Sequence, residues 1–238
     1  MGSPEIQTIP TSRRPTPRTG ADRRIASGLF AFIIVAILAG FAKNFYLRAW
    51  LGTRVLIPTA WLHGFVMSAW LTLFAIQVLF VSRRRIDLHR KLGIFSAAFA
   101  PVVVIIGLLT IIVRARIAIP GASLTQYAML FVAFDGVSLL LFGALVATAV
   151  RCRGRPAVHR RLMTMAMVSL LPPAFGRLVA YATHQHIEVT VLVLMSLTVL
   201  VFIAVDSTRS GRVHRAFVIP GTLVVLVNVA TYIAQSVT

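Results

Sequence analysis

The chain has 238 residues, of which 58% are hydrophobic and only 13% charged, and its mean hydropathy is +0.87. A soluble domain carries about 25% charged residues, so this composition excludes an ordinary water-soluble domain and favours a membrane protein. The net charge of +18 does not indicate nucleic-acid binding, because the basic residues lie in short gaps between apolar runs, as membrane topology requires. The single Cys152 excludes an intrachain disulfide.

Residues 1–24 are polar and rich in proline, threonine, serine and arginine, which predicts a disordered basic tail. From residue 25 to residue 238 we expect a single domain, an all-α bundle of about seven transmembrane helices joined by short connections. Each apolar run is close to the roughly 20 residues that cross a bilayer. The first run lacks a clear signal-peptide cleavage site, so we read it as a retained anchor. The expected spans are 25–43, 58–81, 92–113, 126–150, 162–183, 188–206 and 216–236.

The basic residues also predict an orientation. Eighteen of the 24 arginines and lysines fall on the side of the amino terminus, five fall on the other side, and Arg177 lies inside a span. Because arginine and lysine concentrate in cytoplasmic loops, we place the amino terminus in the cytoplasm and the carboxyl terminus outside. The predicted location is the inner membrane of a bacterial cell.

A His-Arg motif opens a helix at His89-Arg90 and again 70 residues later at His159-Arg160, with a weaker copy at His214-Arg215. The second and third spans therefore form one hairpin, and the fourth and fifth spans form a second copy with the same orientation. Such copies are parallel repeats, related by an axis along the membrane normal. The last two spans fit a degenerate third copy. Convergence among arginine-rich turns is the alternative.

A family resemblance rests on five short motifs: His63-Gly64, Ala69-Trp70, Leu88-His89-Arg90-Lys91-Leu92-Gly93, His159-Arg160-Arg161-Leu162-Met163 and the later Arg177. On these motifs the chain resembles, over roughly residues 40–225, a family of uncharacterised bacterial multi-pass membrane proteins. The resemblance implies a multi-pass helical fold. It implies no reaction, because the family has no known function.

Asp135 and Arg177 are ionisable residues within apolar spans, where such residues usually face the bundle interior and mark function. Each lies 21 positions from residue 156 in the intervening turn, so the two belong at one depth in the outer half of the membrane and could pair. One interpretation is a ligand site, with Arg177 holding an anion and Asp135 accepting a proton or cation. The other is a structural ion pair that locks two helices together.

Three more polar residues fall in the same outer half: His63, Tyr181 and Asn228. Pro172-Pro173 interrupts the fifth span just before Arg177, because proline removes helix hydrogen bonds. Broken helices beside buried charges form the ligand sites of many membrane proteins. We therefore predict a pocket in the outer half, built on His63, Asp135 and Arg177.

His89, His159 and His214 have a different setting, each at the start of a helix beside arginines such as Arg90 and Arg160. Neutral imidazoles there suit ligation of haem b or a metal ion, whose identity the sequence leaves unknown. The free amides and arginines suit the anionic headgroups of lipids on the cytoplasmic side equally well. The helical hairpins with histidines are analogous to b-type cytochromes at the level of layout only.

Phosphate-loop, zinc-protease and nucleophile-elbow motifs are absent, and the chain has only six acidic residues. An enzyme is therefore not favoured. Three functions stay open: a protein that binds or moves a small ligand or proton, a haem-binding electron-transfer protein, and a structural or assembly subunit. The third implies other membrane proteins, or copies of this chain, as partners.

Overall fold

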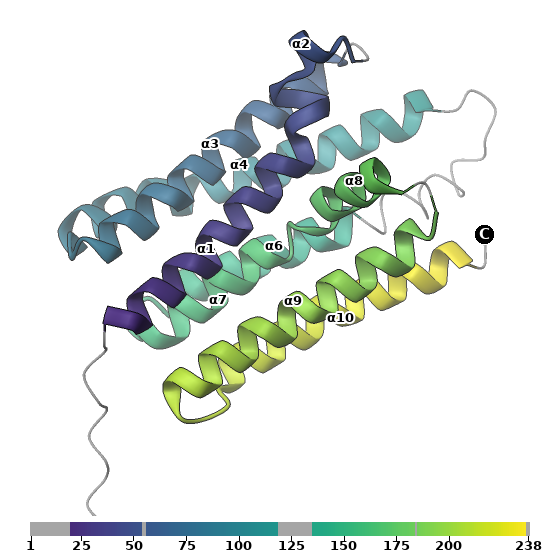
Figure 1. The fold of residues 1–238 in the computed structure, drawn as a ribbon. Coiled ribbons are helices and arrows are strands. Elements are labelled where there is room, and N and C mark those ends of the chain that lie inside the picture. Colours follow the sequence, from purple (N-terminus) through teal and green to yellow (C-terminus); the bar gives the residue numbers. More distant parts are fainter. Residues whose placement is uncertain (1–19, 54–55, 119–134, 184, 237–238) are drawn as a thin grey trace, which may run out of the picture.

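The computed structural model describes residues 20–53, 56–118, 135–183 and 185–236, and all regular structure within these ranges is helical (Figure 1). The elements are α1 (Gly20–Phe41), the π-helical turn η1 (Ala42–Tyr46), α2 (Arg48–Leu51), α3 (Pro58–Ser82), α4 (Ile86–Ala118), α6 (Val137–Arg151), α7 (Pro156–Val168), α8 (Pro172–Ala182), α9 (Ile187–Ser210) and α10 (Arg215–Ser236).

The predicted fold class, an all-α bundle that crosses the membrane several times, is confirmed. Five of the described helices are long and apolar enough to span a bilayer, and a sixth span results if α7 and α8 count as one bent segment. The predicted span 126–150 lies partly outside the described residues, which show its last part as the 15-residue α6. The predicted disordered tail lies outside them up to residue 19, and α1 begins at Gly20.

Large apolar side chains point away from the bundle, as contact with lipid requires. Val35 is 61% exposed, Ile94 71% and Ile105 62%. In water such a surface would associate or aggregate, whereas lipid tails are as apolar as these side chains. The protein is therefore a multi-pass membrane protein whose outer surface is in contact with the bilayer.

Consecutive helices pack as antiparallel hairpins: α3 with α4, α6 with α7, and α9 with α10. Helix α1 packs against α8 and α3, and α4 packs against α6. In Figure 1 the turns 83–85, 152–155 and 211–214 lie at the same end of the bundle as the start of α1. We call this the basic end. Helix α2 and the end of α10 lie at the opposite end.

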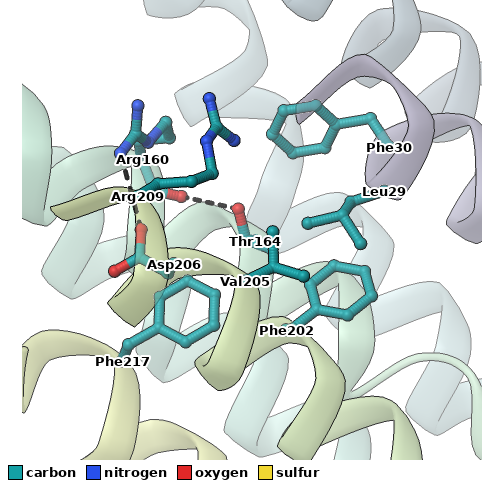
Figure 2. Close-up of a pocket in the computed structure, with 9 residues that line it drawn as sticks. All are labelled: Leu29, Phe30, Arg160, Thr164, Phe202, Val205, Asp206, Arg209 and Phe217. Atoms are coloured by element: carbon teal, nitrogen blue, oxygen red, sulfur yellow. Dashed lines mark hydrogen bonds and ion pairs between the residues drawn. The ribbon is translucent and has the colours of Figure 1, made fainter. Parts of the chain in front are cut away.

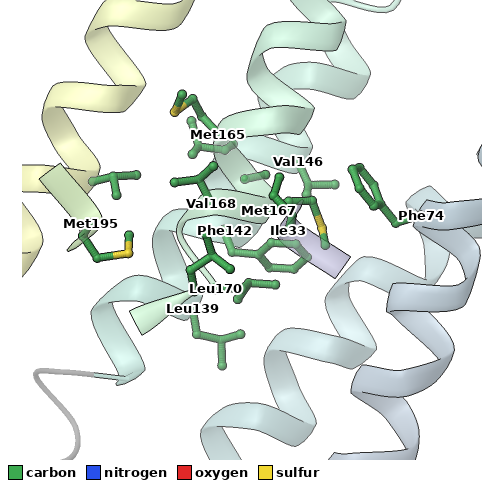
Figure 3. Close-up of a cluster of buried hydrophobic side chains, with 14 of the residues drawn as sticks. Ile33, Phe74, Leu139, Phe142, Val146, Met165, Met167, Val168, Leu170 and Met195 are labelled. Carbon is green, nitrogen blue, oxygen red and sulfur yellow. The ribbon is translucent and has the colours of Figure 1, made fainter. Parts of the chain in front are cut away.

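Helix α7 forms the centre of the core (Figure 3). Its side chains Met165, Met167 and Val168 are at most 1% exposed and pack around Phe142 of α6. The indole Nε1 of Trp70, from α3, donates to Met167 Sδ at 3.3 Å. Because α7 is mostly buried from Arg161 to Val168, that part of the helix can carry polar groups that a lipid-facing helix could not.

The fifth predicted span is interrupted just before Pro172-Pro173, as these two prolines predict. Helix α7 ends at Val168, α8 begins at Pro172, and the two are bent by 40°. Ser169 in the break is 1% exposed, and its hydroxyl donates to the Ala166 carbonyl at 2.8 Å. This bond satisfies a carbonyl near the helix end, which would otherwise be exposed to an apolar core. Pro101 and Pro220, by contrast, lie inside continuous helices.

Candidate functional site

At the end opposite the basic end, ionisable side chains from four separate segments gather around Arg177 of α8. They are His63 of α3, Arg114 of α4, Asp135 just before α6, and Arg177 of α8. Arg177 and Arg114 lie close enough to act electrostatically on both His63 and Asp135. We call these four residues the His63 cluster. The sequence placed three of them together and missed Arg114, which was assigned only to an outer loop.

Arg177 is held by contacts within and beside α8. One of its Nη atoms donates to the Pro173 carbonyl at 2.6 Å, and its guanidinium carbon lies 4.3 Å from the centre of the Phe41 ring. A cation over an aromatic face is stabilised by the ring quadrupole, here within a largely apolar bundle. Gly40 lets α1 pack closely against α8, because a Cβ atom at this position would lie 2.6 Å from the Ala174 carbonyl oxygen.

Asp135 and Arg177 do not form a direct ion pair. Among the described residues, no nitrogen of Arg177 comes within 4.0 Å of an Asp135 oxygen, although each lies within the electrostatic range of the other. The Nδ1 atom of His63 is buried and has no hydrogen-bond partner in the described chain. Within the described part of the chain, the cluster therefore contains charged and polar groups whose hydrogen-bonding capacity is not fully used.

Tyr181 and Asn228 have local roles in the structure. The Tyr181 hydroxyl donates to the Gly40 carbonyl at 3.3 Å, which ties the end of α8 to α1, and the Lys43 ammonium lies 5.4 Å from the centre of the Tyr181 ring. Tyr181 lies within the electrostatic range of Arg177. Asn228 is 6% exposed and donates to the Val224 carbonyl of its own helix at 2.7 Å. No described contact joins Asn228 to the His63 cluster.

At the basic end, His89 of α4 and His159 of α7 face one another, with ring centres 6.2 Å apart and planes at 75°. His159 Nδ1 lies 2.8 Å from the Ala149 carbonyl oxygen, so it carries the proton and donates, leaving Nε2 as an acceptor. The Gln77 amide, turned so that both its ends find partners, donates to His89 Nδ1 and accepts from the Gly93 amide at 2.9 Å. Because His89 Nδ1 accepts the bond from Gln77, the ring proton of His89 is on Nε2.

His214 is not paired with these two rings, and it precedes the first residue of α10. Its Nδ1 accepts a hydrogen bond from the Ala216 amide at 3.1 Å, so the ring caps the helix. Partial burial, Arg161 and Arg212 lower the pKa of His214 below its usual value of 6.5, against an opposing effect of Asp206. A neutral ring is the form that can accept this bond. Arg90 has an exposed side chain.

Sequence reasoning missed the ion pairs of Asp206, which lies near the end of α9. The Arg161 Nε atom lies 2.7 Å from one Asp206 carboxylate oxygen, and an Arg160 Nη atom lies 3.6 Å from the other. Arg161 is only 3% exposed, so this interaction is inside the bundle rather than on its surface. A scarce acidic residue in a run of arginines was the signal that could have identified it. No three histidine, cysteine or acidic side chains gather as a metal site within the described ranges.

Comparison of the chain with protein-family models, curated proteins and solved structures finds no match. Of the family resemblance, only the expectation of a multi-pass helical membrane protein is supported, and no family is identified. The fold and the lipid-facing surface define the class of this protein, a multi-pass helical membrane protein.

Proposed function

We propose that this protein is a non-enzymatic inner-membrane protein of bacteria that binds a small anion, or passes one across the membrane, at the His63 cluster. One observation carries the proposal: four ionisable side chains from four segments converge beside a broken helix without forming a direct ion pair between Asp135 and Arg177. Ionisable groups at such depth generally mark a binding site or a transport path.

The charges in the cluster indicate the kind of ligand. With a neutral His63, the cations Arg114 and Arg177 against the carboxylate of Asp135 leave one positive charge. A monoanion such as a small carboxylate would neutralise it. Arginine suits this role, because its planar guanidinium group binds a carboxylate through two parallel hydrogen bonds. Asp135 would take up a proton when the anion binds closer to it, which would couple ligand and proton.

The test is binding of acetate, lactate, benzoate and chloride to the detergent-purified protein, measured by calorimetry or thermal shift. Arg177→Gln should leave a folded protein whose affinity for the preferred anion is at least about tenfold lower, as for the loss of a charged hydrogen bond. Arg116→Gln is the control, because this arginine is exposed and lies two residues after Arg114 at the same end of the bundle but is not part of the His63 cluster. If Arg177→Gln binds every probe as well as the original chain, the proposal fails.

Haem b, or a single metal ion, is a second candidate ligand, at the His89–His159 pair. Imidazole nitrogens bind metals at about 2 Å, so two rings whose centres are 6.2 Å apart could share one ion. The hydrogen bonds leave Nε2 of His159 unprotonated and able to bind a metal. His89 carries its proton on Nε2, and this proton would have to leave before that nitrogen could bind. The distance between the two rings thus suits a pair of metal ligands, but only His159 has the protonation that a ligand needs.

An absorption spectrum of the purified protein before and after dithionite tests the haem proposal. A Soret band that shifts on reduction, and that is lost in His159→Ala but kept in His186→Ala, would support it. His186 is the matched control, because it precedes α9 at the other end of the bundle. A colourless protein from cells supplied with haem would exclude haem.

The assembly role remains a third proposal. It predicts that the protein purifies together with other membrane proteins, or as a homo-oligomer, and that substitutions in the His63 cluster leave those contacts intact. Crosslinking in membranes before detergent extraction would show either partner.

A further inference from the structure

Two buried polar atoms on one face of α3 have no hydrogen-bond partner among the described residues. They are Thr59 Oγ1 and His63 Nδ1. Thr59 and His63 are one helical turn apart, so their side chains lie on the same side of α3. His63 belongs to the His63 cluster, and Thr59 therefore extends that cluster by one turn toward the start of α3.

Thr59 is the exception among the hydroxyl groups of α3. The hydroxyls of Ser68 and Thr72 donate to carbonyls one turn earlier in the helix, at 2.7 Å and 2.9 Å. Figure 2 shows the same arrangement in α7, where the Thr164 hydroxyl donates to the Arg160 carbonyl at 2.9 Å. Thr59 is the second residue of α3, so no helical turn precedes it to supply such a carbonyl.

The neighbouring helix α4 does not satisfy these two atoms either. Thr110 Oγ1 lies 2.8 Å from the Ile106 carbonyl oxygen and 3.2 Å from the Thr59 carbonyl oxygen, so its one proton is used by the backbone. Arg114 lies one turn beyond Thr110 and acts electrostatically on His63. A buried polar atom without a partner costs about 1–3 kcal/mol, so two of them beside a cluster of cations indicate an occupant.

We infer that Thr59 Oγ1 and His63 Nδ1 bind a hydroxyl group of the ligand, so that the ligands are small hydroxylated monocarboxylates such as lactate. The inference rests on the proposed anion site at the His63 cluster and names its ligand class. The ligand carboxylate binds to the guanidinium groups of Arg114 and Arg177, and the ligand hydroxyl binds to α3.

The chemistry of the two atoms selects a hydroxyl group. A threonine hydroxyl both donates and accepts, and Nδ1 of a neutral imidazole does one or the other. A ligand hydroxyl can therefore satisfy both atoms, whichever ring nitrogen of His63 carries the proton. A second carboxylate could only accept, and Arg114 and Arg177 would repel an ammonium group. A methyl group at the same place would leave both atoms unpaired.

The test compares two pairs of acids that differ only by a hydroxyl group: lactate with propionate, and 3-hydroxybutyrate with butyrate. Binding to the full chain in a neutral detergent is measured by calorimetry at pH 7. In at least one pair the hydroxy acid should bind about tenfold or more tightly than its partner acid, because the partner leaves buried polar atoms unpaired. The pair that shows the difference gives the spacing between carboxylate and hydroxyl.

Thr59→Val tests the assigned residue, because valine has nearly the shape of threonine without the hydroxyl. The variant should bind the preferred hydroxy acid about tenfold more weakly and its partner acid within about twofold of the original chain. Thr59→Ser should restore the preference. Thr72→Val is the matched control, since it removes an exposed hydroxyl from the same helix and should change neither affinity.

Two results would overturn the inference and leave the anion site in place. In the first, neither hydroxy acid binds more tightly than its partner acid although Arg177→Gln weakens both, which would assign the two atoms to water. In the second, Thr59→Val keeps the full preference. If chloride binds and none of the four acids does, the ligand class is also refuted. If no anion binds, the proposed anion site fails as well. If Thr59→Val does not fold, the acid pairs on the original chain still decide.

Discussion

The two ends of the bundle treat their charges differently. At the basic end the buried cation Arg161 touches a carboxylate at 2.7 Å, and the rings of His159 and His214 are fixed by hydrogen bonds to the backbone. At the opposite end Arg177 and Asp135 come near each other without a direct ion pair, and His63 Nδ1 is buried with no partner among the described residues.

This difference separates a structural role from a binding role. A charge whose partners are all within the protein contributes to the fold and has little left for a ligand. Charges gathered without direct partners destabilise the protein in the absence of a ligand, and a ligand relieves that. The comparison therefore predicts that substitution of the buried, ion-paired Arg161 acts mainly on stability, whereas substitutions in the His63 cluster act mainly on binding.

The largest expected effect is that of Arg161→Ala. Removing Arg161 leaves Asp206 with only its longer contact to Arg160, at 3.6 Å, and this loss should cost at most about 3–5 kcal/mol. Unfolding in detergent, followed by circular dichroism, would measure the loss. Arg153→Ala, at an exposed arginine near the same turn, should change stability by less than about 0.5 kcal/mol. Equal effects of the two variants would contradict a structural role for the ion pair.

A smaller effect is expected where α1 meets α8. In Gly40→Ala the new Cβ atom would lie 2.6 Å from the Ala174 carbonyl oxygen, which is backbone and cannot turn aside. Separating the helices should cost about 1–3 kcal/mol and should also disturb Arg177. Gly28→Ala is the control in the same helix, because nothing lies within 4 Å of its added carbon. It should be neutral or slightly stabilising.

Asp135→Asn should change stability by less than about 1 kcal/mol, because it breaks no direct ion pair. Its expected effect is on ligands: with the negative charge removed, monoanions should bind more tightly and with less dependence on pH. Anion titrations at pH 6 and pH 8, beside those of the original chain, would measure both changes. If Asp135→Asn simply unfolds the protein, the residue is structural and the contrast between the two ends is lost.

The smallest expected effect is that of pH on His214. Since its pKa is lowered in the folded protein, the unfolded chain takes up the proton first as the pH falls. The free energy of unfolding should therefore fall as the pH drops below about 6.5, and it should stop falling once the pH is below the lowered pKa of His214 in the folded protein. His214→Asn keeps a capping group that does not titrate, so its unfolding temperature should fall less between pH 7.5 and pH 5. An identical fall in both proteins would exclude this contribution.

Hydrophobic runs were enough to predict the spans that the structure describes. Span 58–81 agrees with α3 to within one residue, and the break before Arg177 is where two consecutive prolines predicted it. Helix α4 begins earlier than expected, at Ile86, because a helix continues through polar residues at the membrane surface once the apolar part has formed. Hydropathy marks the apolar part only.

The side-chain contacts could not be predicted in the same way. Periodicity shows which helices exist, but the pairing of Asp206 with Arg161 depends on how α7 and α9 rotate about their axes. The place of Arg114 was missed for a different reason: hydropathy assigned it to a loop, whereas α4 continues past it to Ala118. The facing rings of His89 and His159 are compatible with the proposed hairpin repeat, which remains a prediction.

The enclosed position of α7 has a consequence for how the protein is made. During synthesis α7 and α8 enter the membrane before α9 and α10, which later pack against them. Until then Arg161 and Thr164, at 3% and 5% exposure in the finished bundle, would face lipid or the insertion machinery. The final hairpin therefore completes the insertion of a helix that precedes it in the chain. A nascent chain halted before residue 187 should hold α7 less firmly in the bilayer than the full chain does.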